Sequence, residues 1–252
     1  MTAAARTLVI MPAWNEAAVI GDTVRELLST VEGVDLLVVD DGSSDETAAA
    51  ARDAGAAVMV LPFNLGVGGA LRAGFKYAWE NGYDRAIQVD ADGQHEPSQI
   101  EAVLAGLDQA DISIGARFSG VGDYAVRGPR RWAMSLLAAV FSRVARTRLT
   151  DITSGFRAAN RRAILQYTRH YPAEYLGDTV DSLMTALRAG LTVVQVPVAM
   201  RPRQGGEPSH SPVKAAIYLV RSVFALFIAM TRAKNRVPLP TLGSAPELEA
   251  TH

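Results

Sequence analysis

"DLLVVDDGSSDETAAAARDAGAAVMVLP", residues 35–62, carries the clearest fold signal in the sequence. Its apolar run at 36–39 ends in two carboxylates and several turn residues, and Asp45 or a neighbouring serine is placed to cap the next helix. A second apolar run follows at 56–62. Uninterrupted apolar strands joined by a helix are typical of a parallel sheet covered on both faces.

The same alternation continues on both sides of this stretch. Apolar runs at 7–11, 85–93 and 111–118 predict further strands, and segments with helical spacing separate them. We therefore expect an α/β fold with a mostly parallel central sheet flanked by helices. Functional groups in such sheets gather beyond the carboxyl ends of the strands. The residues that the sequence places there are Asp40, Asp41, Asn64, Asp90, Asp92 and Arg117.

The second half of the chain is less regular. A basic amphipathic pattern at 128–149 predicts a helix, and "DITSGFRAANRRAIL" at 151–165 predicts a loop, a short strand and a helix start. An acidic-fronted helix at 177–190 precedes a strand at 192–198. A loop rich in Gly, Pro and Ser follows at 201–212.

The composition excludes several classes of function. Of the 252 residues, 49% are hydrophobic, which suffices for one large domain, or for one domain with a small appendage. Lys and Arg (25) nearly balance Asp and Glu (26), so no overall basic field attracts nucleic acid. The absence of cysteine excludes disulfides, thiolate metal sites and cysteine nucleophiles. The N-terminus shows no secretory pattern, so we expect a cytoplasmic protein.

The C-terminal segment 211–235 is expected to form an amphipathic helix, followed by a disordered tail at 236–252. Its uncharged part, Ser222–Thr231, is too short to span a bilayer, which needs about 20 apolar residues. The helix can pack on the protein's own core, lie on a membrane surface with Phe224 and Phe227 inserted, or bind a partner helix.

Asp90 and Asp92 end the fourth predicted strand in "VDADGQH", residues 89–95. Mg²⁺ typically takes one or two carboxylates in a site that water and phosphate oxygens complete. Gln94 and His95 can add a ligand or a supporting contact. A solvated acidic turn is the alternative, but the position directly after a buried strand favours a metal site.

"PAWNE", residues 12–16, ends the first predicted strand. Trp14 offers a stacking face and Glu16 a hydrogen-bond acceptor, which together with the acidic pair after the second strand can bind a nucleobase and ribose. Alternatively, Trp14 belongs to the core and Asn15 caps the next helix. The glycines of "NLGVGGALRAG", residues 64–74, serve either helix packing or close approach of a ligand, because their spacing fits neither a P-loop nor a dinucleotide turn.

Together, these motifs resemble a known family. They occur in the order and spacing of inverting family 2 glycosyltransferases with the GT-A fold, and within them the chain looks most like the dolichyl- and polyprenyl-phosphate mannose and glucose synthases. The resemblance covers about residues 7–200 and rests on five motifs: "MPAWNE", "VVDDGSSDET", "NLGVGGALRAG", "VDADGQH" and "DITSGFRA".

The resemblance implies a GT-A catalytic domain at 1–210, with a nucleotide-sugar-binding half at 1–116 and an acceptor half at 117–210. It implies a UDP- or GDP-sugar donor site that comprises Pro12, Ala13, Trp14, Glu16, Asp40, Asp41, Asn64, Asp90, Ala91 and Asp92. The implied cofactor is Mg²⁺ or Mn²⁺, held on the donor diphosphate by Asp90, Asp92 and Gln94.

The resemblance also implies polyprenyl phosphate as the acceptor. Its phosphate would be bound by Arg117, Arg131, Ser135 and Arg201, with Arg201 or Arg203 as the loop arginine that closes over the phosphates. An ionised phosphate attacks without a strong general base, whereas a hydroxyl acceptor needs one. Asp178 and Asp181 are the candidate bases, or else they only supply favourable charge at a helix N-terminus. The predicted catalytic residues are Asp92, Asp178, Asp181 and Arg203.

Some features depart from the family pattern. Trp14 stands where this branch often has Tyr, and the missing QxxRW motif argues against a processive polysaccharide synthase. We expect the enzyme at the cytoplasmic face of the membrane, through the 211–235 helix or a small membrane-protein partner, and a homo-oligomer is compatible with the sequence. The alternatives are a glycosyltransferase for a soluble hydroxyl acceptor and a non-catalytic nucleotide-sugar-binding module.

Overall fold

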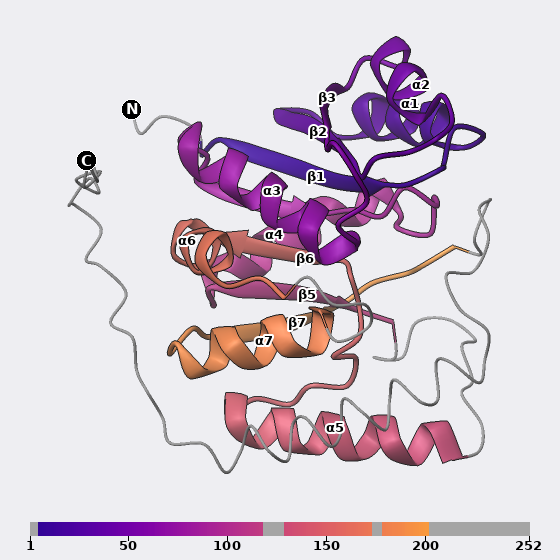
Figure 1. Cartoon of the computed structure of the whole chain (residues 1–252). Coiled ribbons are helices and arrows are strands. Elements are labelled where there is room, and N and C mark those ends of the chain that lie inside the picture. Colours follow the sequence, from indigo (N-terminus) through magenta and orange to yellow (C-terminus); the bar gives the residue numbers. More distant parts are fainter. Residues whose placement is uncertain (1–4, 118–128, 173–177, 202–252) are drawn as a thin grey trace, which may run out of the picture.

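A seven-stranded sheet forms the centre of the molecule, in the order β3-β2-β1-β4-β6-β5-β7 (Figure 1). The computed structural model describes residues 5–117, 129–172 and 178–201. The strands are β1 (Thr7–Ala13), β2 (Val34–Asp40), β3 (Ala57–Val60), β4 (Arg85–Gln88), β5 (Ile112–Ala116), β6 (Arg157–Asn160) and β7 (Val193–Pro197). Only β6 runs antiparallel to its neighbours in this sheet, so the predicted mostly parallel α/β fold is confirmed.

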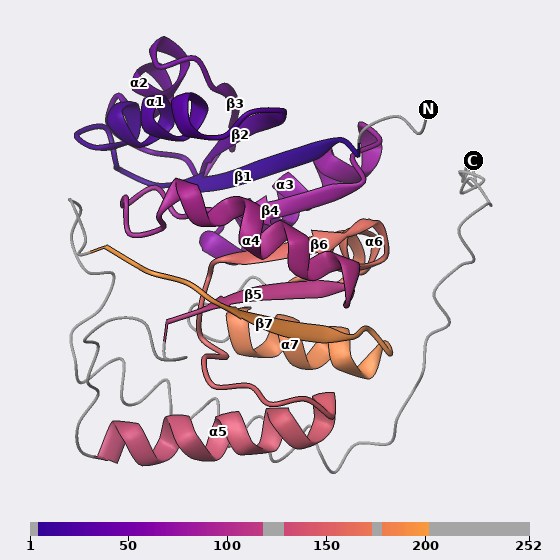
Figure 2. The same cartoon turned by 180° about the vertical axis from the view of Figure 1, so that it is seen from behind.

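Helices cover both faces of the sheet (Figures 1 and 2). One face carries α1 (Ile20–Thr30), α2 (Thr47–Asp53) and α4 (Ile100–Ala105), with 3₁₀ turns at Pro97–Gln99 and Gly106–Asp108 on either side of α4. The other face carries α3 (Val67–Glu80), α5 (Pro129–Ala145), α6 (Arg161–Arg169) and α7 (Asp178–Arg188).

Alternate residues of β1 supply two separate hydrophobic cores. Leu8 and Ile10 pack beneath α3 and its neighbours, whereas Val9 and Met11 pack beneath α1 and α4. Successive side chains of a strand point to opposite faces, and all four are essentially inaccessible to solvent. This two-sided burial explains the uninterrupted apolar run, and each such side chain stabilises the fold by about 1.5–3 kcal/mol.

The glycines that open α3 serve backbone geometry and packing. Gly66 precedes the helix with a φ of 80°, a conformation that side chains rarely adopt. A Cβ on Gly74 would stand 2.4 Å from Cγ2 of Ile10, so the missing side chain lets α3 approach β1. The helix-packing interpretation of this motif therefore holds for Gly74.

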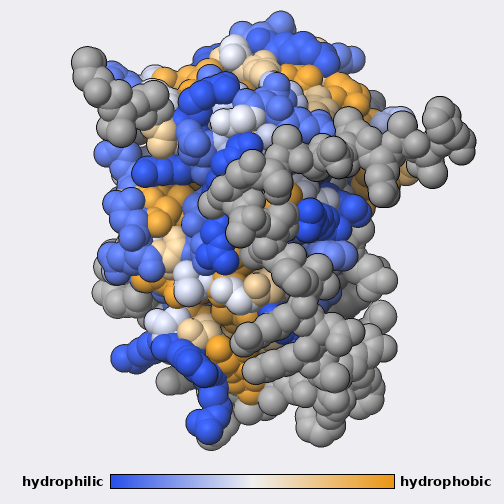
Figure 3. All heavy atoms as spheres, turned by 90° about the vertical axis from the view of Figure 1, so that its left-hand side faces the viewer, coloured by the Kyte–Doolittle hydropathy of each residue, from blue (hydrophilic) through white to orange (hydrophobic). Residues whose placement is uncertain are grey.

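A polar network stabilises the edge of the sheet at the amino ends of the parallel strands. On the surface at this edge, polar and apolar side chains are interspersed (Figure 3). The Asp111 carboxylate accepts hydrogen bonds from Asn160 Nδ2 at 2.9 Å, Arg162 at 3.0 Å and Thr192 N at 2.9 Å. Burial opposes ionisation of Asp111, but these hydrogen bonds outweigh it and hold its pKa below the usual value. This edge is therefore a structural junction between β5, β6 and β7.

The predicted helix at 211–235 and the predicted tail at 236–252 lie outside the described residues. Within 5–117, 129–172 and 178–201, no helix combines the length and apolar character needed to cross a membrane.

Candidate active site at the carboxyl edge of the sheet

The ends of β1, β2, β4 and β5 meet at one edge of the sheet because these strands run in the same direction. The reversal of β6 brings another segment to this edge: the loop before β6, residues 151–156, which would lie at the opposite edge if β6 were parallel. Motifs from both halves of the sequence therefore converge here.

The turn after β1 is held against the loop after β2. Asn15, with a φ of 54°, accepts a hydrogen bond from Ser44 N at 2.9 Å, and Glu16 N donates to Thr47 Oγ1 at 2.8 Å. Pro12 and Ala13 are buried as the last residues of β1.

The core interpretation of Trp14 is wrong, because Trp14 is 49% exposed. Asn15 does not cap α1 either: the helix has Val19 at its N-cap and no side-chain cap. The indole ring is thus presented at the surface beside the β2 loop, where a planar ligand can stack on it.

Asp40 and Asp41 are both buried, each 3% exposed, at the end of β2. Asp40 Oδ1 accepts from Ser43 N at 3.0 Å, and Asp41 Oδ1 accepts from Leu65 N at 2.7 Å. Burial raises the pKa of Asp41 and the neighbouring Asp40 adds to this effect, against opposing backbone hydrogen bonds. Asp40 therefore organises the loop after β2 and Asp41 the loop after β3, where Asn64 is exposed and accepts from Gly66 N at 3.0 Å.

The loop after β4, residues 90–96, is here called the D-x-D loop. Asp90 Oδ1 accepts from Gln88 Nε2 at 3.0 Å, and Asp92, 8% exposed, accepts from Gln94 N at 3.0 Å. Ala91 is buried, and its carbonyl oxygen accepts from Thr23 Oγ1 at 3.1 Å. Asp92 is therefore held in place by its own loop.

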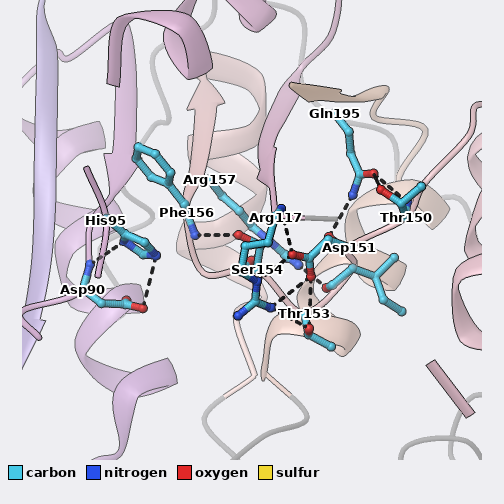
Figure 4. Close-up of polar contacts among 11 residues, drawn as sticks. Asp90, His95, Arg117, Thr150, Asp151, Thr153, Ser154, Phe156, Arg157 and Gln195 are labelled. Carbon is cyan, nitrogen blue, oxygen red and sulfur yellow. Dashed lines mark hydrogen bonds and ion pairs between the residues drawn. The ribbon is translucent and has the colours of Figure 1, made fainter. Parts of the chain in front are cut away.

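His95 orients Asp90 rather than facing solvent (Figure 4). Its Nδ1 accepts the Asp90 backbone N–H at 3.0 Å, which assigns the ring proton to Nε2. Nε2 lies 3.6 Å from Asp90 Oδ2, and the ring stacks on Phe156 with centroids 4.7 Å apart. His95 thus supports the carboxylate of Asp90, and Phe156 connects it to the loop before β6.

The donor set of the D-x-D loop suits a hard cation. Asp90, Asp92 and Gln94 offer only oxygen ligands, the type that Mg²⁺ and Mn²⁺ prefer. In the described part of the chain, no three His, Cys, Asp or Glu side chains gather into a metal site. Three oxygen ligands would supply part of the coordination of such a cation and leave positions for phosphate oxygens and water.

Arg117, at the end of β5, is oriented by the fully buried Asp151 (Figure 4). Asp151 Oδ2 accepts from Arg117 Nε at 2.7 Å, Oδ1 accepts from its NH2 at 3.1 Å, and Thr153 Oγ1 also accepts from NH2 at 3.1 Å. Gln195 of β7 in turn donates to the Asp151 carbonyl at 2.8 Å. The sequence analysis did not assign Asp151, although it begins the "DITSGFRA" motif.

Arg157 joins the loop before β6 to the start of α7. It is 5% exposed, and its guanidinium donates to the carbonyl oxygens of Ser154 at 2.8 Å, Thr179 at 2.7 Å and Ile152. Sequence reasoning missed this residue because an arginine in a short strand gives no sign of its burial.

The structure describes the remaining predicted site residues only in part. Asp178 and Asp181 begin α7, and Asp181 is exposed. Arg131 and Ser135 lie one turn apart in the first half of α5. The side chains of Arg131, Ser135 and Asp178 lie outside the described residues, as does all of Arg203.

Arg201 forms ion pairs with two carboxylates that the sequence did not predict as its partners. Its guanidinium donates to both carboxylate oxygens of Glu96 and, at 2.6 Å, to Glu26 of α1. Its assignment to the acceptor phosphate stays a prediction, and it would require these ion pairs to open.

This mostly parallel seven-stranded sheet, flanked by helices on both faces, has the GT-A fold. Glucosyl-3-phosphoglycerate synthase from Mycobacterium tuberculosis, solved with Mn²⁺, UDP and glucosyl-3-phosphoglycerate, has the same fold: the TM-score is 0.68 at 24% identity, over 90% of this chain and 80% of that chain.

The sequence comparisons assign the family. The model of glycosyl transferase family 2 matches residues 8–168. Undecaprenyl-phosphate mannosyltransferase of Micrococcus luteus is 33% identical over 213 residues, 82% of this chain and 88% of that protein. Polyprenol monophosphomannose synthase of Mycolicibacterium smegmatis is 33% identical over 227 residues, 85% of each. The chain belongs to glycosyl transferase family 2.

Proposed function

We propose that this glycosyltransferase transfers a sugar from a UDP- or GDP-sugar to polyprenyl phosphate, with inversion at the anomeric carbon. The observation that carries the proposal is the convergence of the D-x-D loop and the Arg117–Asp151 pair at one edge of the sheet. The two relatives named for undecaprenyl phosphate and polyprenol support the choice of acceptor.

The donor would lie across the ends of β1, β2 and β4. Trp14 would stack on the base, while Asp40, Asp41 and Glu16 would accept hydrogen bonds from base and ribose, with Pro12, Ala13, Asn64 and Ala91 shaping the pocket. Asp90, Asp92 and Gln94 would hold Mg²⁺ or Mn²⁺. When bound, the cation supplies charge that stabilises the leaving nucleoside diphosphate.

The acceptor phosphate would be bound by Arg117 together with Arg131, Ser135 and a loop arginine, Arg201 or Arg203. Asp151 fixes the Arg117 guanidinium by two parallel contacts, so its orientation is set before a ligand arrives. A phosphate monoester has a second pKa of about 6 and is mostly dianionic near neutral pH, so it can attack without a general base. A position on the cytoplasmic face of the membrane, through the segment 211–235, would give access to the lipid.

A soluble hydroxyl acceptor is the competing candidate, with Asp178 or Asp181 as general base. The two acceptors are distinguished by the variants Asp178→Asn, Asp181→Asn and Arg131→Ala, assayed by transfer of radiolabelled sugar from the donor. Polyprenyl phosphate as acceptor predicts a large loss in Arg131→Ala and retained transfer in both Asn variants. Loss in the Asn variants with Arg131→Ala tolerated would contradict the proposal.

A further inference from the structure

Two backbone contacts lay the segment after β7 against the D-x-D loop. Met200 and His95 form an antiparallel bridge, and Arg201 N–H donates to the Gln94 carbonyl oxygen at 3.0 Å. The backbone of Gln94, the predicted third metal ligand, is therefore fixed by a residue more than a hundred positions away in sequence. Side-chain contacts add to this short bridge.

The Arg201 side chain provides these contacts. It makes a two-pronged ion pair with Glu96, at the end of the D-x-D loop, and donates through NH1 to Glu26 on α1 at 2.6 Å. A planar guanidinium can serve two carboxylates in this way, whereas a lysine ammonium cannot reproduce the fork.

The D-x-D loop thus has two kinds of support. Its first half is held by residues of the loop itself and its strand, through Gln88, His95 and the Asp92–Gln94 turn. Its second half is also contacted by Arg201, through the Gln94 carbonyl oxygen and the Glu96 carboxylate. Ligand-bearing loops whose outer contacts are removed typically lose 10–100-fold in metal affinity.

We propose that Arg201 is a positioning residue for the metal-binding loop: through Glu96 and the Gln94 carbonyl it sets where Gln94 stands relative to Asp92. This inference rests on the proposed function, since it requires that the D-x-D loop binds a divalent cation with the donor. It differs from the acceptor role, because it places the effect of Arg201 on metal and nucleotide rather than on lipid phosphate.

The test measures binding of UDP and GDP by calorimetry, with and without Mn²⁺ and without acceptor, for the full chain and for Arg201→Lys, Arg201→Ala and Glu96→Gln. Arg162→Ala is the matched control, because it also removes an arginine from a carboxylate, Asp111, but at the opposite edge. Thermal unfolding verifies that each variant is folded, and Arg201→Lys keeps the charge if Arg201→Ala fails to fold.

We expect nucleotide binding in the presence of Mn²⁺ to weaken roughly tenfold in Arg201→Ala and Glu96→Gln, less in Arg201→Lys, and not in Arg162→Ala. Metal-free nucleotide binding should match wild type in all four. Unchanged Mn²⁺-dependent binding in folded Arg201 and Glu96 variants overturns the inference. If Mn²⁺ does not enhance nucleotide binding to wild type, the metal-dependent donor site of the proposed function fails, and the inference fails with it.

Discussion

Gly155 lies directly against the carboxylate of Asp90. A Cβ on Gly155 would stand 3.1 Å from Asp90 Oδ2 and 2.9 Å from Gln88 Nε2, the atom that donates to Asp90 Oδ1. The loop before β6 therefore packs against the first carboxylate of the D-x-D loop, and a side chain at position 155 would have to displace Gln88 or Asp90. Segments from the two halves of the sequence touch at this point.

Gly155→Ala should therefore displace the Asp90 carboxylate or the Gln88 amide that holds it. We expect the Mg²⁺ concentration for half-maximal activity to rise about tenfold, while unfolding by urea changes little. Gly21→Ala is the control, since its new methyl group would meet only the Arg25 side chain, at 3.3 Å. An unchanged Mg²⁺ requirement in Gly155→Ala would show that this contact does not matter for the metal site.

Asp151→Asn should weaken acceptor binding more than donor binding. The amide cannot accept from both sides of the Arg117 guanidinium, so the arginine loses its fixed orientation. We expect KM for polyprenyl phosphate to rise about tenfold or more and KM for the donor to stay near wild type. Asp111→Asn, which disrupts an Arg–Asp pair at the opposite edge of the sheet, should leave both KM values unchanged. Equal changes for acceptor and donor would argue against the role given to Asp151.

Arg157→Lys should loosen the junction between the loop before β6 and α7. One ammonium cannot reach the carbonyls of Ile152, Ser154 and Thr179 together. We expect a loss of about 2 kcal/mol in the free energy of unfolding. Hydrogen exchange should accelerate at 151–156 and in the first turn of α7, and remain unchanged in α1. Uniform acceleration throughout the chain would indicate a global rather than a local role.

The stability contributed by Asp111 should depend on pH in a defined direction. Its pKa is lowered in the folded protein, so its contribution is present above the usual Asp value of 3.8 and is lost as the pH falls through the lower folded value. At about pH 7, Asp111→Asn should lower the free energy of unfolding by about 2 kcal/mol, because an amide N–H₂ then faces donors. In urea titrations the difference from wild type should shrink below about pH 4. A difference that grows towards acid pH would contradict the assignment.

The strands of the first half and the polar residues at their ends could be predicted because local sequence patterns indicate them. Each apolar run of the first half became a strand, and Asp40, Asp90 and Arg117 fall at the ends of β2, β4 and β5 as expected. Alternating burial on both faces of β1 explains why the strand pattern was unambiguous. A local pattern predicts an element and its end, and parallel strands bring such ends together.

The remaining features depend on contacts between distant residues. The reversal of β6 follows from its pairing with β4 and β5, about 70 and 45 residues earlier, and no property of the segment 157–160 announces it. The ion pair of Arg201 with Glu96 spans 105 residues. A loop arginine next to predicted phosphate ligands is equally compatible with a phosphate contact, so only the structure reveals its carboxylate partners.

A transfer assay with product detection by mass spectrometry tests the proposed reaction itself. Wild type and Asp92→Asn are incubated with Mg²⁺ or Mn²⁺, a panel of UDP- and GDP-sugars, and a short polyprenyl phosphate. We expect one glycosylated polyprenyl phosphate from wild type, formed only with a divalent cation and lost in Asp92→Asn. Binding of UDP or GDP by wild type without any glycolipid product from any donor would contradict it.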